Sequence, residues 1–251
     1  AFHEWKTHKA IKLIVATRLV TTDGFEAIAY PTDREAYARL CRLITVAKRK
    51  APHSEHTECL LSVDDILGAA DGQIFVVLPP DDISEEFTRR LERLATIAPG
   101  RTFLAGIHRH RGDEPRRLGA LDDLGRRCRA PMVATNDVHY HTPRRRPLAD
   151  VVTCIREKCT VHEAGFRLAA NAERHLKPPA EMARLFAAFP DAIRRTCDIA
   201  NAVRFELGDL KNEYPDEPVP PGKTAQQHLE DETWAGARRR YRDEIPGKVA
   251  N

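Results

Sequence analysis

The sequence predicts an α/β fold in which parallel strands alternate with crossover helices. Two observations predict it. Apolar, strand-like runs at 74–78, 102–107 and 131–135 are each followed by a helical spacing of apolar residues. Because parallel neighbours need a helical crossover, this order indicates a parallel sheet or barrel. With 251 residues, 42% of them hydrophobic, the chain is also long enough to bury a core.

Before this alternation, the sequence predicts an antiparallel hairpin and one long helix. Residues 11–15 and 25–30 are rich in β-branched and apolar side chains, and the turn signal 21–24 lies between them. Thr32 or Asp33 then caps a helix whose inward face carries apolar residues at helical spacing: Ala36, Leu40, Leu43, Ile44 and Ala47. Residues 50–61 are expected to form a surface loop.

The central elements follow from caps and apolar spacing. Ser62 caps a short helix that Gly72 is expected to end, and Ser84 opens the next helix. A helix over 115–128 presents Leu118, Leu121 and Leu124, and a further helix spans Pro147 to Glu157. After residue 165 we expect no further strands. One helix should follow Pro178, and a second should run from Pro190 to Val203. A connector over 208–227 and a polar helix from Thr224 to Tyr241 should complete the chain.

Composition excludes several classes of protein. No run approaches the ~18 apolar residues of a membrane span, and the first eight residues lack the features of a signal peptide. The six cysteines form no CxxC pair, and Cys154 and Cys159 are expected to be small buried hydrophobes. These features favour reduced thiols in the cytoplasm.

The net charge of +3 hides an uneven distribution. Residues 52–100 carry 3 basic and 10 acidic side chains, whereas residues 101–160 carry 13 basic and 7 acidic ones. Such a contrast favours one electropositive face that could meet phosphate, although solvated helix surfaces have the same pattern. Three consecutive arginines, Arg144, Arg145 and Arg146, are the candidate contacts to nucleic acid, with solvated arginines as the alternative.

Two candidate metal ligands follow directly after the predicted strand 131–135. Asp137 and His139 offer a carboxylate and an imidazole two residues apart, which together could bind a divalent ion. In the alternative interpretation, Asp137 caps the loop and His139 donates a hydrogen bond to it. His108 and His110 form a weaker pair because arginines flank them. The chain has no P-loop, GxGxxG, GxSxG or HExxH motif, and no aspartate pair that would suggest two-metal nucleotidyl transfer, so no catalytic residue is assigned.

The stretch 133–143, followed by 145–158, closely resembles bacterial C-family DNA polymerases, the relatives of the polymerase III alpha subunit, and among them the error-prone polymerases. Shorter matches support this over roughly residues 11–251: 29–34, 40–43, 108–113 and 205–207. The resemblance implies a fragment of a DNA-directed DNA polymerase, a nucleotidyltransferase of DNA repair and translesion synthesis in the SOS response. The whole protein would use Mg²⁺, DNA and deoxynucleoside triphosphates, with a sliding clamp and other mutasome components as partners.

The resemblance also implies a domain plan. Residues 1–165 would form a partial, distorted (β/α)7 barrel of the PHP (polymerase and histidinol phosphatase) type, with its N-terminal strands missing. Residues 166–207 would begin the polymerase thumb and palm region, and 208–251 would be a Pro-rich connector and helix. The catalytic palm aspartates would lie beyond Asn251, so this chain alone is expected to lack polymerase activity.

The family's last pair of metal ligands maps onto Asp137 and His139, and the other ligands do not carry over. The first His-x-His would lie before Ala1. Arg18 stands where relatives have a Glu ligand, Glu26 where they have a His, and Leu78 or Pro79 near a Cys. A Zn²⁺ or Mn²⁺ site is therefore predicted to be degenerate, with Arg18 able to pair with Asp137. The alternatives are a metal-dependent PHP phosphoesterase or proofreading 3′–5′ exonuclease that uses these two ligands, and a non-catalytic docking module.

Overall fold

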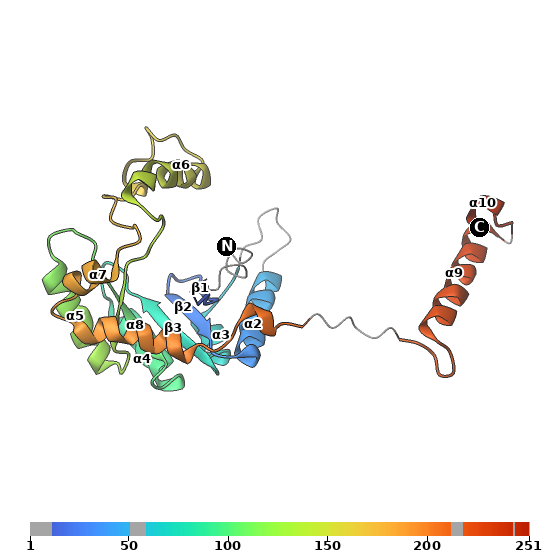
Figure 1. The fold of residues 1–251 in the computed structure, drawn as a ribbon, viewed down its shortest axis with the longest axis horizontal. Helices are drawn as coiled ribbons and strands as arrows, with labels where there is room; N and C mark the ends of the chain where they lie inside the picture. The colour runs from blue at the N-terminus through green and yellow to red at the C-terminus, as the bar shows by residue number, and fades with distance from the viewer. Residues whose placement is uncertain (1–11, 51–58, 212–217, 243, 251) are drawn as a thin grey trace. The chain divides into compact units, whose positions relative to one another are not determined.

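The structure is a computed structural model that describes residues 12–50, 59–211, 218–242 and 244–250. The chain divides into two compact units between Leu210 and Lys211. The larger unit contains the sheet and the candidate site, and the smaller unit contains the last helices (Figure 1). The sequence-predicted alternation of strands and helices is confirmed in the larger unit.

The sheet of the larger unit has five strands in sequential order: β1 (Thr17–Val20), β2 (Glu26–Pro31), β3 (Gln73–Leu78), β4 (Thr102–Ile107) and β5 (Met132–Thr135). The first two pairs, β1–β2 and β2–β3, are antiparallel, and β3–β4 and β4–β5 are parallel. Among the described strands, β5 does not pair back with β1. The α/β class is thus confirmed, while a PHP barrel is not.

The N-terminal hairpin forms, but its first strand is displaced from the predicted one. Residue 11 lies outside the described part of the chain, and residues 12–16 have no regular structure. The strand instead follows at Thr17, because the turn sets the register: Val20 pairs with Glu26, and the Thr21 N–H donates to the Phe25 carbonyl over 3.0 Å. Gly24, at φ +81°, completes the turn in a conformation that favours glycine. Continued towards the N-terminus, this register would place residues 12–14 opposite positions beyond Pro31, where β2 ends.

Helices connect and cover the strands: α2 (Arg34–Lys50), α3 (Val63–Gly68), α4 (Glu85–Ile97), α5 (Glu114–Arg127), α6 (Arg146–Glu157), α7 (Pro179–Leu185) and α8 (Pro190–Ala202). Three of them, α2, α3 and α4, begin at caps that the sequence predicts. The Asp33 carboxylate accepts from the Ala36 N–H over 2.8 Å, Ser62 forms a capping box with Asp65, and Ser84 caps α4.

Two boundaries differ from prediction. The helix after Ser62 ends at Gly68 and not at Gly72, which at φ +69° forms the turn into β3. A Cβ at Gly72 would lie 2.8 Å from the Ala36 Cβ, so the close approach to α2 also requires glycine here. The predicted loop 50–61 falls mostly on residues 51–58, outside the described part, and α2 includes Lys50.

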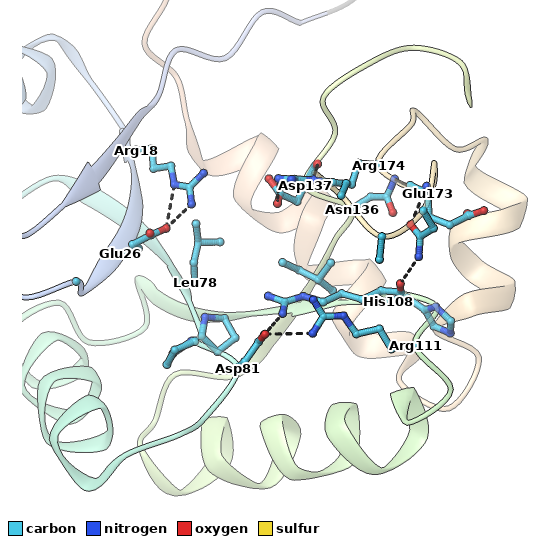
Figure 2. Close-up of a pocket in the computed structure, with 18 residues that line it drawn as sticks. Arg18, Glu26, Leu78, Asp81, His108, Arg111, Asn136, Asp137, Glu173 and Arg174 are labelled. Atoms are coloured by element: carbon cyan, nitrogen blue, oxygen red, sulfur yellow. Dashed lines mark hydrogen bonds and ion pairs between the residues drawn. The ribbon is translucent and has the colours of Figure 1, made fainter. Parts of the chain in front are cut away.

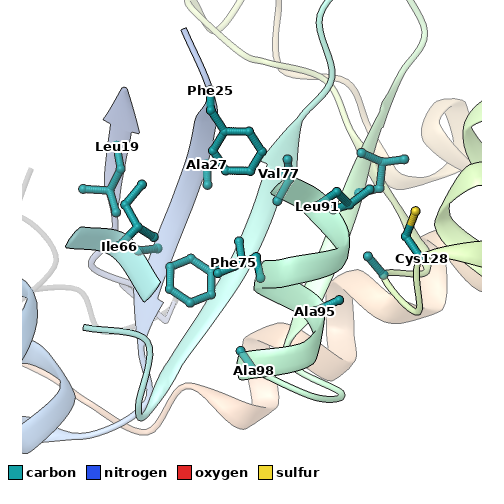
Figure 3. Packing of buried hydrophobic residues seen from close by; sticks show 14 of the residues in the cluster. Leu19, Phe25, Ala27, Ile66, Phe75, Val77, Leu91, Ala95, Ala98 and Cys128 are labelled. Carbon is teal, nitrogen blue, oxygen red and sulfur yellow. The ribbon is translucent and has the colours of Figure 1, made fainter. Parts of the chain in front are cut away.

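Side chains of the strands alternate between two apolar layers. On one face, Phe75, Val77, Leu104 and Met132 pack with the inward residues of α2 to α5 (Figure 3). On the other face, Ile74, Val76, Ala105 and Val133 pack against Ile199 and Val203 at the end of α8, which crosses the sheet in Figure 1. A sheet covered on both faces accounts for the continuous apolar run of β3.

The smaller unit consists of α9 (Ala225–Tyr241) and α10 (Gly247–Ala250). Thr224 opens α9 with a capping box, as its position in the sequence predicts. The helix buries no residue of its own, and its apolar Leu229 and Trp234 are exposed. In the described part of the chain, no helix has the length and apolar character that crossing a bilayer requires.

Candidate functional site

A pocket of about 440 Å³ opens where β3, β4 and β5 end. The loops after these strands line it together with the hairpin and residues 169–174, and we call it the strand-end pocket (Figure 2). Carboxyl ends of parallel strands meet at one edge of a sheet, which is where α/β proteins commonly build their sites. Its charged lining residues are Arg18, Glu26, Asp81, Arg109, Arg111, Asp137, Glu173 and Arg174.

Asp137 and His139, the predicted metal pair, both contact the guanidinium of Arg174. The Arg174 Nη2 donates to the Asp137 Oδ2 and lies 2.5 Å from the His139 Nε2. Asp137 itself has φ +43°, and its carbonyl accepts from the Arg174 Nε over 3.3 Å. An arginine carries its charge at every accessible pH. A permanent cation therefore already lies between the two side chains that a metal ion would use.

Backbone pairing holds Arg174 in this position. The His139 N–H donates to the Arg174 carbonyl over 2.9 Å, and the Leu176 N–H donates to the Tyr140 carbonyl over 3.0 Å. Tyr140 and His175 form an isolated parallel bridge. The Asn136 side-chain amide adds a bond of 2.5 Å to the His175 carbonyl. These bonds hold residues 174–176 against the loop that follows β5.

The surroundings of His139 favour its neutral form. Partial burial, and then the Arg174 guanidinium, lower the pKa of His139 against the opposing effect of Asp137. Because a guanidinium can only donate, the His139 Nε2 must accept from Arg174. His139 is therefore held as an acceptor with its proton on Nδ1.

Two further carboxylates of the strand-end pocket are also paired with arginine. Arg18 forms an ion pair with Glu26, its near neighbour across the hairpin, so it does not take the Asp137 partner that the sequence allowed. Asp81, after β3, pairs with Arg109 and Arg111, after β4. Hydrogen bonding to Arg111 is the main cause that lowers the pKa of Asp81.

The second histidine pair contributes His108 to the lining of the strand-end pocket. The centroids of the His108 and His110 rings are 4.3 Å apart, and the His110 Nε2 lies 3.3 Å from the Glu173 Oε2. Burial, followed by the charge of His110, lowers the pKa of His108. Across the described ranges, no group of three His, Cys, Asp or Glu side chains is placed to hold a metal ion.

The three consecutive arginines do not act as a unit. Arg144 and Arg145 are exposed on the short 3-10 turn Pro143–Arg145. Arg146 instead turns inward: its Nη2 donates to the Ala169 carbonyl over 2.7 Å, and its Nε lies 3.5 Å from the Asp150 carboxylate. Nucleic-acid contact stays a prediction for these residues, with Arg144 and Arg145 the more accessible.

The fold and the pocket identify an α/β protein with a charged pocket at the ends of its parallel strands, which is where enzymes of this fold class commonly have their active sites. Comparisons with curated proteins narrow this class. The chain is 48% identical over 242 residues to an error-prone DNA polymerase of Caulobacter vibrioides, with 96% of this chain and 22% of that protein covered. Error-prone polymerases of Bradyrhizobium diazoefficiens (48%, 95% and 21%) and Brucella abortus (45%, 99% and 23%) match similarly. A scan against models of protein families finds no match.

The resemblance read from the sequence is thereby confirmed: over nearly its whole length, the chain is homologous to bacterial error-prone DNA polymerases. It spans about a fifth of the length of these relatives. The structure adds site residues that the sequence did not indicate, among them Asp81, Glu173 and Arg174. Arg174 belongs to no motif, and 35 positions of sequence separate it from His139.

Proposed function

We propose that this chain is the N-terminal PHP region of a C-family error-prone DNA polymerase. The observation that carries the proposal is the 45–48% identity across 95–99% of the chain. In this assignment, residues 1–165 belong to a PHP domain, 166–207 begin the polymerase body, and 208–251 connect to the rest. The whole protein would extend primers on damaged templates in the cytoplasm, with Mg²⁺ at palm aspartates outside this chain and with a sliding clamp and mutasome components as partners.

Within that protein, the strand-end pocket would be structural and not hydrolytic. Its arginine–carboxylate pairs join successive loops. Asp81 ties the loop after β3 to Arg109 and Arg111 after β4, and Asp137 ties the loop after β5 to Arg174. A degenerate site of this kind supports the loops by charge pairing where a metal ion would otherwise bind the ligands together.

The side chains do not fit a catalytic Zn²⁺ or Mn²⁺. Catalytic zinc sites usually have about three protein ligands, whereas among the described residues no third His, Cys, Asp or Glu is placed to hold an ion together with Asp137 and His139, and Arg174 contacts both. Arg18 adds a second positive charge to the pocket lining. The described residues of the pocket therefore do not provide a ligand set for metal-dependent hydrolysis.

Elemental analysis tests the proposal against the phosphoesterase or exonuclease alternative. The chain is purified without chelator, its zinc, manganese and iron content is measured, and single-stranded DNA hydrolysis and primer extension are assayed. We expect metal far below one ion per chain, unchanged in Asp137→Ala, and neither activity. Stoichiometric metal that is lost in Asp137→Ala together with exonuclease activity would establish the hydrolase instead. Primer extension that survives repurification would overturn the location of the polymerase centre.

A further inference from the structure

The C-terminal end of α6 brings two cysteines together. The Lys158 N–H donates to the Ile155 carbonyl over 3.2 Å, and the Cys159 N–H donates to the Cys154 carbonyl over 3.0 Å. Lys158 is left-handed, with φ +53°. These are the two bonds and the left-handed residue of a Schellman motif. Cys154 and Cys159 occupy the two positions of that motif whose side chains characteristically touch.

The environment of the two thiols differs. Cys154 is buried and Cys159 is half-buried. Both line a surface groove of about 490 Å³ with Val151, Lys158 and Val161, so a small oxidant can reach the pair. Burial, and then the adjacent Cys159 thiol, raise the pKa of Cys154. The more accessible Cys159 is therefore suited to react first and Cys154 to resolve the product.

We propose that Cys154 and Cys159 form a reversible, peroxide-sensitive dithiol that closes as an intramolecular disulfide at the end of α6. The Cys159 thiolate attacks one oxygen of hydrogen peroxide, the O–O bond breaks, and a sulfenic acid and hydroxide form. The Cys154 thiolate then attacks the Cys159 sulfur, forming the S–S bond and expelling a second hydroxide. Protons released by the two thiols convert the hydroxides to two waters, so two thiols are oxidised and one peroxide is reduced.

The other cysteines are placed differently. Cys41 and Cys197 are exposed on α2 and α8, and Cys128 is buried at the end of α5, where its Sγ lies 3.8 Å from a Glu92 oxygen. Among the described residues, only Cys154 and Cys159 are joined through such a turn. Disulfides need Cα atoms about 4.4–6.8 Å apart. The 3.0 Å hydrogen bond between the Cys159 N–H and the Cys154 carbonyl holds the two backbones close together, as such a linkage requires.

The test counts thiols and maps the linkage. The reduced 251-residue chain is treated with hydrogen peroxide, the remaining thiols are labelled with a maleimide, and the mass and tryptic peptides are measured. Of the six thiols, we expect two to be lost per chain and regained with dithiothreitol. Trypsin cuts after Arg156 and Lys158, so the disulfide should join peptide 146–156 to peptide 159–167.

Matched variants complete the test. Cys41→Ser should still lose two thiols at the paired positions, whereas Cys159→Ser and Cys159→Ala should give no linkage to Cys154. Sulfinic acid on Cys159 without a disulfide, a cross-linked dimer through Cys41 or Cys197, or no thiol loss at millimolar peroxide would each overturn the proposal. The unsubstituted chain decides the outcome even where a variant folds poorly.

Discussion

The Arg174 guanidinium contacts the Asp137 carboxylate, from 37 positions further along the chain. A divalent ion at the same carboxylate would meet this charge at close range. At about 4 Å and an effective dielectric near 20, a unit charge repels a divalent ion by ~8 kcal/mol. Metal binding and this ion pair are thus alternatives at Asp137, and the structure contains the ion pair.

Removing Arg174 should destabilise the larger unit. Arg174→Ala leaves a carboxylate and an imidazole without their donor, and we expect a loss of ~1–2 kcal/mol, because both members of the pair are about one-third exposed and solvent screens them. Urea denaturation measures the change. Arg89→Ala, which removes an exposed arginine paired with Glu86, is the control and should cost at most ~0.5 kcal/mol. Equal losses in both variants would contradict a special role for Arg174.

The lowered pKa values of His139 and His108 predict how the free energy of unfolding changes as the pH falls. Both values are lowered from the ordinary 6.5, by burial and then by Arg174 for His139 and by His110 for His108. Below pH 6.5 the unfolded chain therefore binds protons that the folded chain resists, so stability falls as pH decreases from 6.5 to the folded pKa values. Imidazole NMR titration, assigned with His139→Gln and His108→Gln, checks this. Midpoints at or above 6.5 would refute it.

The sequence predicts the helices and central strands well because their determinants are local. Ser84 caps α4, and its inward Phe87, Leu91 and Leu94 repeat at helical spacing, so the element can be identified without tertiary information. The first strand differs from its predicted position because its determinants are not local. The residues at 11–15 have high β propensity, but the register of the hairpin is fixed by the turn at Thr21 and by pairing to β2.

The candidate site was predicted only in part. Asp137 and His139 could be found because they share one short segment after a strand. Arg174 could not, because its position depends on backbone pairing between Tyr140 and His175, segments far apart in the sequence. The pairing of Arg18 with Glu26 likewise depends on the first strand of the hairpin, which the sequence predicts at 11–15 and the structure places at Thr17–Val20.

Two glycines of α5 should respond oppositely to alanine. A Cβ at Gly125 would lie 2.6 Å from the Ala130 carbonyl oxygen, so Gly125→Ala should destabilise the protein by ~1–3 kcal/mol through overpacking against backbone. A Cβ at Gly119 meets nothing within 4 Å, so Gly119→Ala should stabilise it by ~0.5–1 kcal/mol through helix propensity. Thermal or urea unfolding of the two variants measures both changes in the free energy of unfolding. A stable Gly125→Ala protein would show that the end of α5 can shift away from Ala130.

The exposed arginines at the start of α6 should contribute to DNA binding if the electropositive segment meets phosphate. Arg144→Glu with Arg145→Glu removes two exposed cations, and we expect weaker binding to primer–template DNA irrespective of sequence. Each lost phosphate contact should also reduce the slope of log K against log salt by ~0.9. Fluorescence anisotropy at several salt concentrations measures both effects.

Arg42→Glu with Arg49→Glu makes the same change of charge at exposed positions of α2 and is the control. If both double variants weaken binding equally, only net charge matters, and Arg144 and Arg145 form no specific contact with DNA.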